Sequence, residues 1–450
     1  MEFNKTALNR KLVRIATPIA IQGIVSATLS MVDNIMVGFL GETELAAVGV
    51  GSQLFMVHYL VLFGILSGSA TFMAQFYGTK DMANIRKVIG FDFTLLAVLG
   101  GVIFILVNCF TDAILSVYTE DPAVKALAAQ YVRINSLSFL LLAVSSPLEM
   151  AFKTTQQVRI PMLISNVIFF TNIAVNYVLI FGKLGFPKMG VAGAAIGTIS
   201  SRIIEVVMNS FFAFRRRNEF CGSVMSYFGW DRELVRRIIK NATPTTINEF
   251  FWSFGQTMYV AAFSRISTTA YAAYQAANSI FNIFNFAAFS IGDAALILIG
   301  EKLGEGDMEY TWKLSKHLIK ACILAGLTIG TITVLLSQPL SSIFNLSAAG
   351  KTYTKYILIV FGVTMAADLF NGLQIAGILR AGGDTKFAMI SESACIWLIA
   401  VPLAFTASLI WHLPVHLALL VTRTEMFIRA AILAKRYLSK KWMNTVITDL

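Results

Sequence analysis

Three carboxylate residues stand inside long apolar stretches with no basic residue within one helical turn: Asp33, Glu249 and Asp368. An ionised side chain at the centre of a membrane helix costs roughly 2.5–3.5 kcal/mol on insertion scales, so each needs an explanation. A carboxyl group shielded from water can carry a proton, hold a sodium ion or hold a cationic substrate. The alternative for each residue is a protonated carboxyl group that bonds a neighbouring backbone carbonyl.

Amide and aromatic side chains accompany these carboxylates. Asn172 and Asn176 lie one helical turn apart in one apolar stretch. Amides can ligate an ion through their carbonyl oxygens, bond a carboxyl group, or simply join two helices. Aromatic residues follow Glu249 directly: Phe250, Phe251, Trp252 and Phe254. Some of them could line a cavity for flat apolar cations.

The other ionisable residues of the apolar stretches are Glu149, Arg202, Glu205, Asp293, Glu392, Arg423, Glu425 and Arg429. Arg202 and Glu205 are three residues apart, and Arg423 and Glu425 are two apart. For these four we predict paired structural charges or side chains that reach the interface. The sequence assigns no role to Asp293 and Glu392.

Membrane helices must position these residues, because the composition leaves room for little else. Of 450 residues, 56% are apolar and 14% charged, against about 25% charged in a soluble domain. This composition excludes a soluble enzyme, a disordered protein and a fibrous protein. About 20 mainly apolar residues span a bilayer as one helix. Twelve such stretches can be marked, at about 14–39, 48–76, 88–110, 126–150, 160–182, 190–214, 242–264, 271–300, 317–337, 353–379, 387–411 and 413–434.

The stretches are too long for barrel strands and show no alternation of period two. The sequence therefore predicts an all-α integral membrane protein with twelve transmembrane helices. The loops on one side carry 25 Lys and Arg residues and those on the other side six. Basic loops stay in the cytoplasm, so we predict a multi-pass protein of the plasma (inner) membrane with both termini cytoplasmic.

An internal repeat divides the chain. Ala16-Thr17-Pro18 recurs as Ala242-Thr243-Pro244, and Gly78-x-x-Asp81-Met82 recurs at the same offset of 226 as Gly304-x-x-Asp307-Met308. We predict an N-terminal six-helix bundle at 1–214, a cytoplasmic linker at 215–240 and a C-terminal six-helix bundle at 241–450. The two bundles should be related by an axis along the membrane normal, because each contains an even number of spans.

The linker contains an amphipathic segment. In 230–239, Leu234, Ile238 and Ile239 fall on one helical face and arginines fall on the other. This pattern predicts a short helix on the membrane surface.

Motifs of soluble enzymes are missing from the sequence. No phosphate-binding P-loop occurs, the four histidines form no HxxxH pair, and the four cysteines are far apart. We therefore expect neither enzymatic activity nor a bound cofactor. The net charge of +11 reflects membrane topology, so nucleic acid is not an expected partner.

Three sequence blocks resemble the multidrug and toxic compound extrusion (MATE) family of transporters. The first runs from Pro18 through Val32-Asp33-Asn34-Ile35-Met36-Val37-Gly38. The second is Asn172-x-x-x-Asn176-Tyr177 followed by Gly190-x-x-Gly193-Ala194-Ala195. The third runs from Gly377 through Arg380-Ala381-Gly382-Gly383-Asp384 to Pro402. With twelve spans and a duplication, the resemblance covers essentially the whole chain.

The resemblance implies roles for particular residues. The first-span aspartate of the family falls on Asp33, and its span-five asparagines fall on Asn172 and Asn176. In a sodium-coupled branch, a span-seven glutamate and a span-ten aspartate bind the cation. Asp368 matches the latter within about one residue, whereas Glu249 lies nearly a turn earlier than its counterpart. On this basis we predict that Glu249 and Asp368 share a site at which Na⁺ and H⁺ compete.

The function implied is secondary-active antiport by alternating access, in which organic cations leave as Na⁺ or H⁺ enters. The expected partners are small organic cations, the coupling ion and membrane lipid, and the expected state is a monomer. A second hypothesis is a flippase of related fold for lipid-linked or amphipathic headgroups. It would need many cationic side chains in its cavity, and the predicted spans carry few unpaired ones. A third hypothesis is a membrane receptor or an intramembrane enzyme. The internal duplication and the lack of a catalytic group of residues argue against it.

Overall fold

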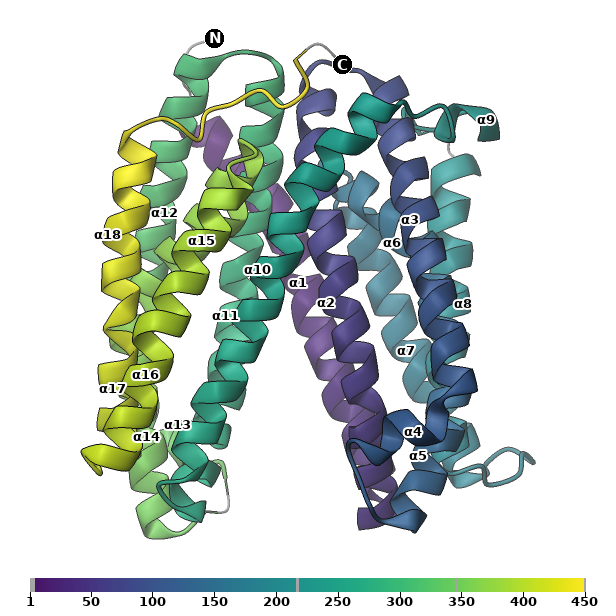
Figure 1. Ribbon diagram of the computed structural model, residues 1–450, viewed down its shortest axis with the longest axis vertical. Helices are drawn as coiled ribbons and strands as arrows, with labels where there is room; N and C mark the ends of the chain where they lie inside the picture. Colours follow the sequence, from purple (N-terminus) through teal and green to yellow (C-terminus); the bar gives the residue numbers. More distant parts are fainter. Residues whose placement is uncertain (1–4, 216–217, 345, 449–450) are drawn as a thin grey trace. The chain divides into compact units, whose positions relative to one another are not determined.

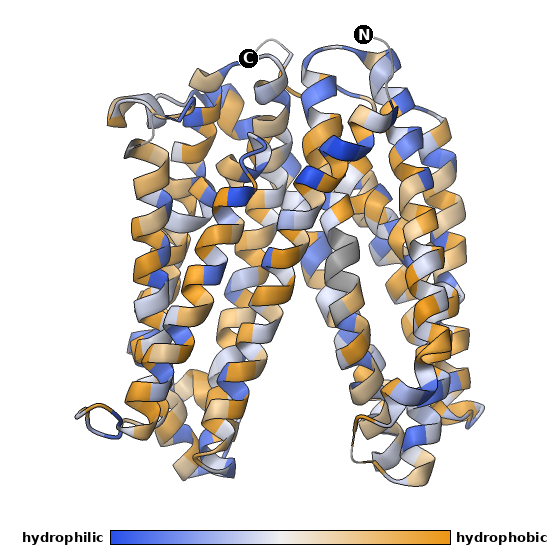
Figure 2. Cartoon of the chain, turned by 180° about the vertical axis from the view of Figure 1, so that it is seen from behind, coloured by the Kyte–Doolittle hydropathy of each residue, from blue (hydrophilic) through white to orange (hydrophobic). Residues whose placement is uncertain are grey.

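The computed structural model describes residues 5–215, 218–344 and 346–448, with the side chains of 215, 283 and 285–289 left out. Within these ranges every regular element is a helix (Figure 1). Figure 2 shows hydrophobic residues along the full length of the long helices. Eight helices, or nine with one bent pair, are long and apolar enough to cross a membrane, counted over the described residues.

The chain forms two compact units, which we call the N-terminal unit (Ile21–Arg236) and the C-terminal unit (Met1–Ala20 with Arg237–Leu450). The start of helix α1 (Lys5–Gly38) belongs to the C-terminal unit through its own contacts. Lys11 Nζ lies 2.7 Å from Glu301 Oε2, and His317 Nε2 lies 2.5 Å from Asn9 Oδ1. The six-helix bundles predicted at 1–214 and 241–450 divide the chain by sequence order, whereas these units are defined by contacts. The predicted division therefore stays a prediction.

The N-terminal unit holds the rest of α1 and the following helices: α2 (Glu42–Gly78), α3 (Met82–Cys109), α4 (Thr111–Ser116), α5 (Pro122–Asn135), α6 (Leu137–Thr154), α7 (Arg159–Phe181), α8 (Val191–Arg215) and α9 (Val224–Tyr227). Helix α1 spans Lys5–Gly38. Helices α5 and α6 together form one predicted span, bent by 43°. The strongest packing is between α7 and α8 and between α3 and α6.

The C-terminal unit adds α10 (Arg232–Ser264), α11 (Thr268–Gly304), α12 (Met308–Leu335), α13 (Ser337–Ser341), α14 (Ala348–Gly372), α15 (Thr385–Cys395), α16 (Val401–Phe405), α17 (Val415–Arg423) and α18 (Glu425–Leu438). Three π-helical segments extend α14 and α15: η1 (Leu373–Leu379), η2 (Ile396–Ala400) and η3 (Thr406–Ile410). Counting α5–α6, α14–η1, α15–η3 and α17–α18 as single rods, the described residues form twelve long helical rods, the number of apolar stretches in the sequence.

Equivalent turns confirm the repeat in detail. Asp81 begins α3 and Asp307 begins α12, each as the N-cap residue. Their backbone angles are nearly equal, with φ −84° and −81° and ψ 78° at both. Each carboxylate accepts a hydrogen bond from the backbone N–H three residues later, which satisfies a free donor of the first helical turn.

The predicted surface helix at 230–239 is wrong. From Arg232 onward these residues are the first turns of the long helix α10, and Leu234 and Ile238 are buried. The start of a packed helix is amphipathic for the same reason as a surface helix, so the pattern could not separate the two. The linker's own short helix is α9, a few residues earlier.

Candidate functional site

In the N-terminal unit, Asp33 and the two asparagines form one hydrogen-bonded cluster. Asn176 Nδ2 donates to Asp33 Oδ1 at 2.8 Å and also to Asn172 Oδ1 at 2.8 Å. Asp33 comes from α1 and both asparagines from α7, and both asparagines are buried. The structure thus brings together three residues that are up to 143 positions apart in sequence.

Helix α8 fixes the Asn176 side chain from the other side. Gly197 lies so close to Asn176 that a Cβ atom at 197 would collide with Asn176 Oδ1. That oxygen has no hydrogen-bond partner in the described part of the chain. The cluster therefore combines a carboxylate with two buried amides, and Asn176 presents its NH₂ group to Asp33 while its oxygen faces Gly197.

Apolar residues of α1 next to Asp33 pack into the core of the N-terminal unit. Met36 and Val37 of α1 are buried in one hydrophobic cluster with Tyr131 and Ile180, and Val32 packs against it. The phenol of Tyr131 also interacts electrostatically with Asp33. Such packing limits access of water and strengthens any electrostatic interaction at the carboxylate.

No basic side chain forms an ion pair with Asp33 among the described residues. Arg202 interacts with it electrostatically, but its guanidinium pairs with Glu205 at 2.5 Å. The predicted Arg202–Glu205 pair is thereby confirmed. Glu149 accepts hydrogen bonds from Gln22 at 2.7 Å and from Lys153 at 2.8 Å.

In the C-terminal unit, Glu249 is paired, contrary to the prediction that it stands alone. Arg380 Nη2 lies 2.5 Å from Glu249 Oε1, and both side chains are largely buried. The arginine follows directly after η1. The sequence could not show this pair because its members are 131 residues apart.

Asp368 also has a basic neighbour, at a looser distance. Arg423 Nη2 lies 3.7 Å from Asp368 Oδ2, and its Nη1 donates to Thr364 Oγ1 at 2.7 Å. The guanidinium also lies over the rings of Phe281 and Phe361, 4.9 and 4.5 Å from their centroids. The predicted pairing of Arg423 with Glu425 is therefore replaced by a pairing with Asp368.

A third buried group was missed by the sequence reasoning. Arg429 lies between two carboxylates, 2.6 Å from Glu392 Oε1 and 3.2 Å from Glu425 Oε1. Asn248 donates to Glu392 Oε2 at 2.8 Å. Two signals could have revealed this group: the four-residue spacing of Glu425 and Arg429, and the equivalence of Asn248 with Gln22 at the repeat offset of 226.

This arrangement bears on the predicted two-carboxylate site. Glu249 contacts Arg380, whereas Asp368 contacts Arg423. Glu249 and Asp368 thus contact two different arginines, and the predicted site shared by the two carboxylates stays a prediction.

Asp92 is a further buried carboxylate that the sequence reasoning overlooked. It lies in α3, and Ser69 Oγ of α2 donates to its Oδ1 at 2.6 Å. Its Oδ2 has no hydrogen-bond partner among the described residues. It could have been found by the rule that selected Asp33, because it lies within the apolar stretch 88–110.

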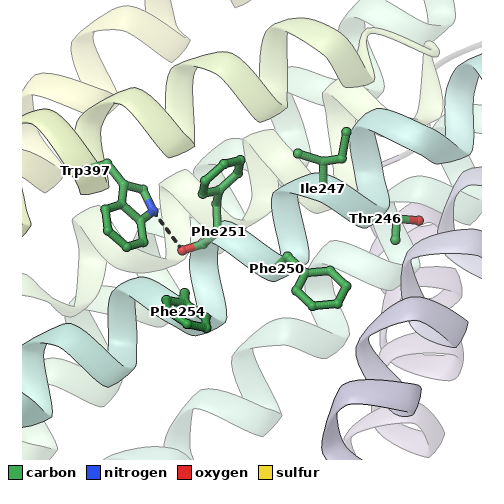
Figure 3. Close-up of a pocket in the computed structure, with 6 residues that line it drawn as sticks. All are labelled: Thr246, Ile247, Phe250, Phe251, Phe254 and Trp397. Atoms are coloured by element: carbon green, nitrogen blue, oxygen red, sulfur yellow. Dashed lines mark hydrogen bonds between the residues drawn. The ribbon is translucent and has the colours of Figure 1, made fainter.

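Helix α10 and η2 enclose an aromatic groove of about 400 Å³ in the C-terminal unit (Figure 3). Its lining residues are Thr246, Ile247, Phe250, Phe251, Phe254 and Trp397. The indole N–H of Trp397 donates to the Phe251 carbonyl at 3.1 Å, which holds the indole in place. Trp397 also stacks on Phe254, with ring centroids 6.4 Å apart. Two of the lining residues, Phe250 and Phe251, follow Glu249 directly in the sequence.

The clusters can bind and release ions or protons, and the groove can bind an apolar aromatic molecule. Carboxylate and amide oxygens are ligands for hard cations, and aromatic faces attract organic cations. Among the described residues, no group of three or more His, Cys, Asp and Glu side chains could hold a metal ion.

Comparison with known proteins agrees with this architecture. The MatE family model matches residues 18–178 and 244–406, two segments that begin 226 residues apart, like the repeat. A "Probable multidrug resistance protein NorM" of Thermotoga maritima is 25% identical over 444 residues, covering 98% of this chain and 94% of that protein. A "Probable multidrug resistance protein YoeA" of Bacillus subtilis is 25% identical over 457 residues, covering 99% and 97%.

Solved structures show the same fold. A MATE crystal structure in the straight conformation has a TM-score of 0.87 at 19% identity, covering 96% of this chain and 97% of that one. A MOP superfamily transporter from Pyrococcus furiosus has a TM-score of 0.86 at 18% identity, with the same coverage. With twelve spans, a duplicated family match and this fold, the chain belongs to the MATE family of membrane transporters.

Proposed function

We propose that this protein is a secondary-active antiporter that exports small organic cations, including drugs, in exchange for Na⁺ or H⁺. The single observation that carries the proposal is the Asp33–Asn176–Asn172 cluster, a carboxylate bonded to buried amides inside membrane helices. Relatives named as multidrug resistance proteins support the substrate class.

The cluster suits a coupling ion because its carboxylate charge is not already neutralised. Na⁺ could be held by Asp33 together with amide oxygens, and a proton could bind the same carboxylate instead. Either event removes a negative charge from an apolar surrounding, so the two ions should compete. Na⁺ binding should therefore weaken as the pH falls.

Glu249 and Asp368 remain candidates for a second cation site, but each carboxylate already contacts an arginine. A cation that binds Glu249 must share the carboxylate with Arg380, and one that binds Asp368 must share it with Arg423. The looser 3.7 Å contact makes Asp368 the easier of the two to approach. We therefore place the principal coupling site at Asp33.

For the organic cation we propose the aromatic groove of the C-terminal unit. A volume of about 400 Å³ falls in the range of small-molecule sites. Phe250, Phe251 and Phe254 are each at least one-third exposed, so their faces are available to a ligand. A flat cation would gain both apolar burial and cation–π attraction there.

Exchange stoichiometry decides what drives export. Moving one charge across 100 mV is worth about 2.3 kcal/mol, but exchanging one H⁺ for one monovalent cation moves no net charge. Either more than one cation enters per substrate, or the ion gradient alone supplies the energy. No cofactor is needed for either scheme, and a monomer suffices.

The test is transport by everted membrane vesicles that contain the protein, with Na⁺ and pH gradients imposed separately. Accumulation of a fluorescent organic cation such as ethidium should follow one of the two gradients and disappear in Asp33→Asn. Accumulation that needs neither gradient, or that persists in Asp33→Asn at matched protein level, would contradict the proposal.

We also propose that both termini and the 215–240 linker lie in the cytoplasm of an inner-membrane protein. In a background without native cysteines, Ser226→Cys should resist an impermeant maleimide added to intact cells, whereas Thr43→Cys should react. The reverse labelling pattern would invert this topology.

A further inference from the structure

The linker segment around α9 is held firmly against α3. The backbone of Tyr227 lies against Gly90 so closely that any side chain at 90 would collide with the Tyr227 carbonyl. The Tyr227 hydroxyl donates to the Phe220 carbonyl at 3.0 Å, and Phe91 meets Trp230 edge to face at 6.1 Å. These contacts determine where α9 lies on the N-terminal unit.

The contact point on α3 gives the depth of α9 in the membrane. Gly90 lies eight residues after Met82, the first residue of α3, which is about 12 Å along the helix. It lies only three residues, about 4.5 Å, after Lys87, the last charge before the apolar part of this span. Helix α9 therefore lies where the headgroup region meets the hydrocarbon core.

The outward side of this segment is apolar. Val224 is 72% exposed and Met225 81%, and Phe228 is 46% exposed while one side of its ring meets Phe93 of α3 at 6.3 Å; Tyr227 on the inward side is buried. Figure 1 shows α9 reaching sideways beyond α3 and α8. Large apolar side chains held outward at this depth contact lipid and not bulk water.

The charges of the linker favour the headgroups of anionic lipids. Segment 215–240 contains seven Lys and Arg residues against three Asp and Glu residues. Arg232 and Arg236, at the start of α10, are exposed. The acidic neighbours Asp231 and Glu233 are also exposed and offset part of this charge.

We propose that α9 is an interfacial anchor. Val224, Met225 and Phe228 insert at the headgroup–acyl boundary of the leaflet where α3 begins, and the linker's basic residues bind anionic phospholipid headgroups there. This assignment concerns the linker alone and holds whichever ion or substrate the protein carries.

The experiment measures the depth of single labelled positions in the full-length protein. Met225→Cys and, as a matched control, Lys441→Cys are made in a cysteine-free background, labelled with a polarity-sensitive fluorophore and reconstituted. Lys441 is exposed but lies next to the buried Trp442 in the C-terminal tail. Lipids brominated near the headgroup end of the acyl chain should quench the label at 225 at least twofold more than the label at 441. Equal quenching at the two positions would overturn the proposal.

Two further arms test the causes. Adding Val224→Ser and Phe228→Ser to Met225→Cys should lower the quenching at 225 toward the value at 441. As a control for folding, Val224→Ser alone should leave the thermal midpoint of the protein unchanged within error. Quenching that stays high in the double variant would show that these side chains are not the anchor.

Vesicles with phosphatidylglycerol should give more quenching at 225 than neutral vesicles, and Arg232→Gln/Arg236→Gln should remove the difference. Equal quenching in both vesicle types would overturn the role of the basic residues.

Discussion

The two units share a duplicated fold, yet the three carboxylates that the sequence singled out have different kinds of partner in them. In the N-terminal unit, Asp33 is bonded to an amide and has no ion-pair partner among the described residues. In the C-terminal unit, Glu249 and Asp368 each face an arginine. An arginine fixes a carboxylate in its charged form, whereas an amide leaves it able to gain a proton or a cation. The repeat thus preserves helices and caps while the chemistry of each half has diverged.

The largest effect is expected at the unpaired carboxylate. Asp33→Asn keeps the shape of the side chain but removes its ability to titrate and to balance a cation. We expect gradient-driven efflux to fall to the level of vesicles without the protein, with normal expression and thermal stability. Asn34→Ala, at the adjacent exposed residue, is the control and should transport normally. A wild-type rate of efflux for Asp33→Asn would contradict the proposed difference between the two units.

The second effect should appear in stability and only in the C-terminal unit. Glu249→Gln leaves the buried guanidinium of Arg380 without its carboxylate. Removing one member of a buried pair typically costs about 3–5 kcal/mol. We expect a clear drop in the thermal midpoint of the purified protein, which Asp33→Asn should not show. Partial recovery in Glu249→Gln/Arg380→Met would identify the charge of Arg380, no longer balanced by Glu249, as the cause. An unchanged midpoint in Glu249→Gln would contradict the pairing.

A double variant separates a shared site from two separate pairs. If Glu249 and Asp368 acted on one ion together, combining Glu249→Gln with Asp368→Asn would add little to either change alone. Because the two residues have different arginine partners, we expect their effects on unfolding free energy to add within about 0.5 kcal/mol. Strong non-additivity in chemical denaturation would restore the shared-site interpretation.

The smallest effect concerns the support of the amide cluster. Gly197→Ala places a methyl group against Asn176 Oδ1 and should displace that side chain. We expect calorimetric Na⁺ affinity, or proton-driven efflux if H⁺ is the ion, to fall about tenfold, equivalent to about 1.4 kcal/mol. Gly101→Ala in α3, where a Cβ would meet nothing within 4 Å, is the matched control. Equal behaviour of the two variants would show that Gly197 does not support the site.

The sequence alone predicts the twelve spans well because each apolar stretch must cross the same thickness of hydrocarbon. The one-turn spacing of Asn172 and Asn176 and the family resemblance also singled out the three members of the Asp33 cluster, although only the structure shows that they are hydrogen-bonded to one another. The sequence could not predict which arginine meets Glu249, because such a choice depends on how distant helices pack. The apolar face at 234–239 was misleading because a buried helix start and a surface helix have the same periodicity.

The π-helical segment η1 lies between Asp368 and Arg380, so it affects how residues of this helix are matched with those of related proteins. A π-turn is in effect an α-helix with one inserted residue, and each helical residue turns the chain by about 100°. A relative without this insertion should show a one-residue gap between 372 and 380. Deleting one residue here would rotate Arg380 away from Glu249, or bring Asp368 to a different face. Residue correspondence in this helix should therefore be assigned from each side of η1 separately.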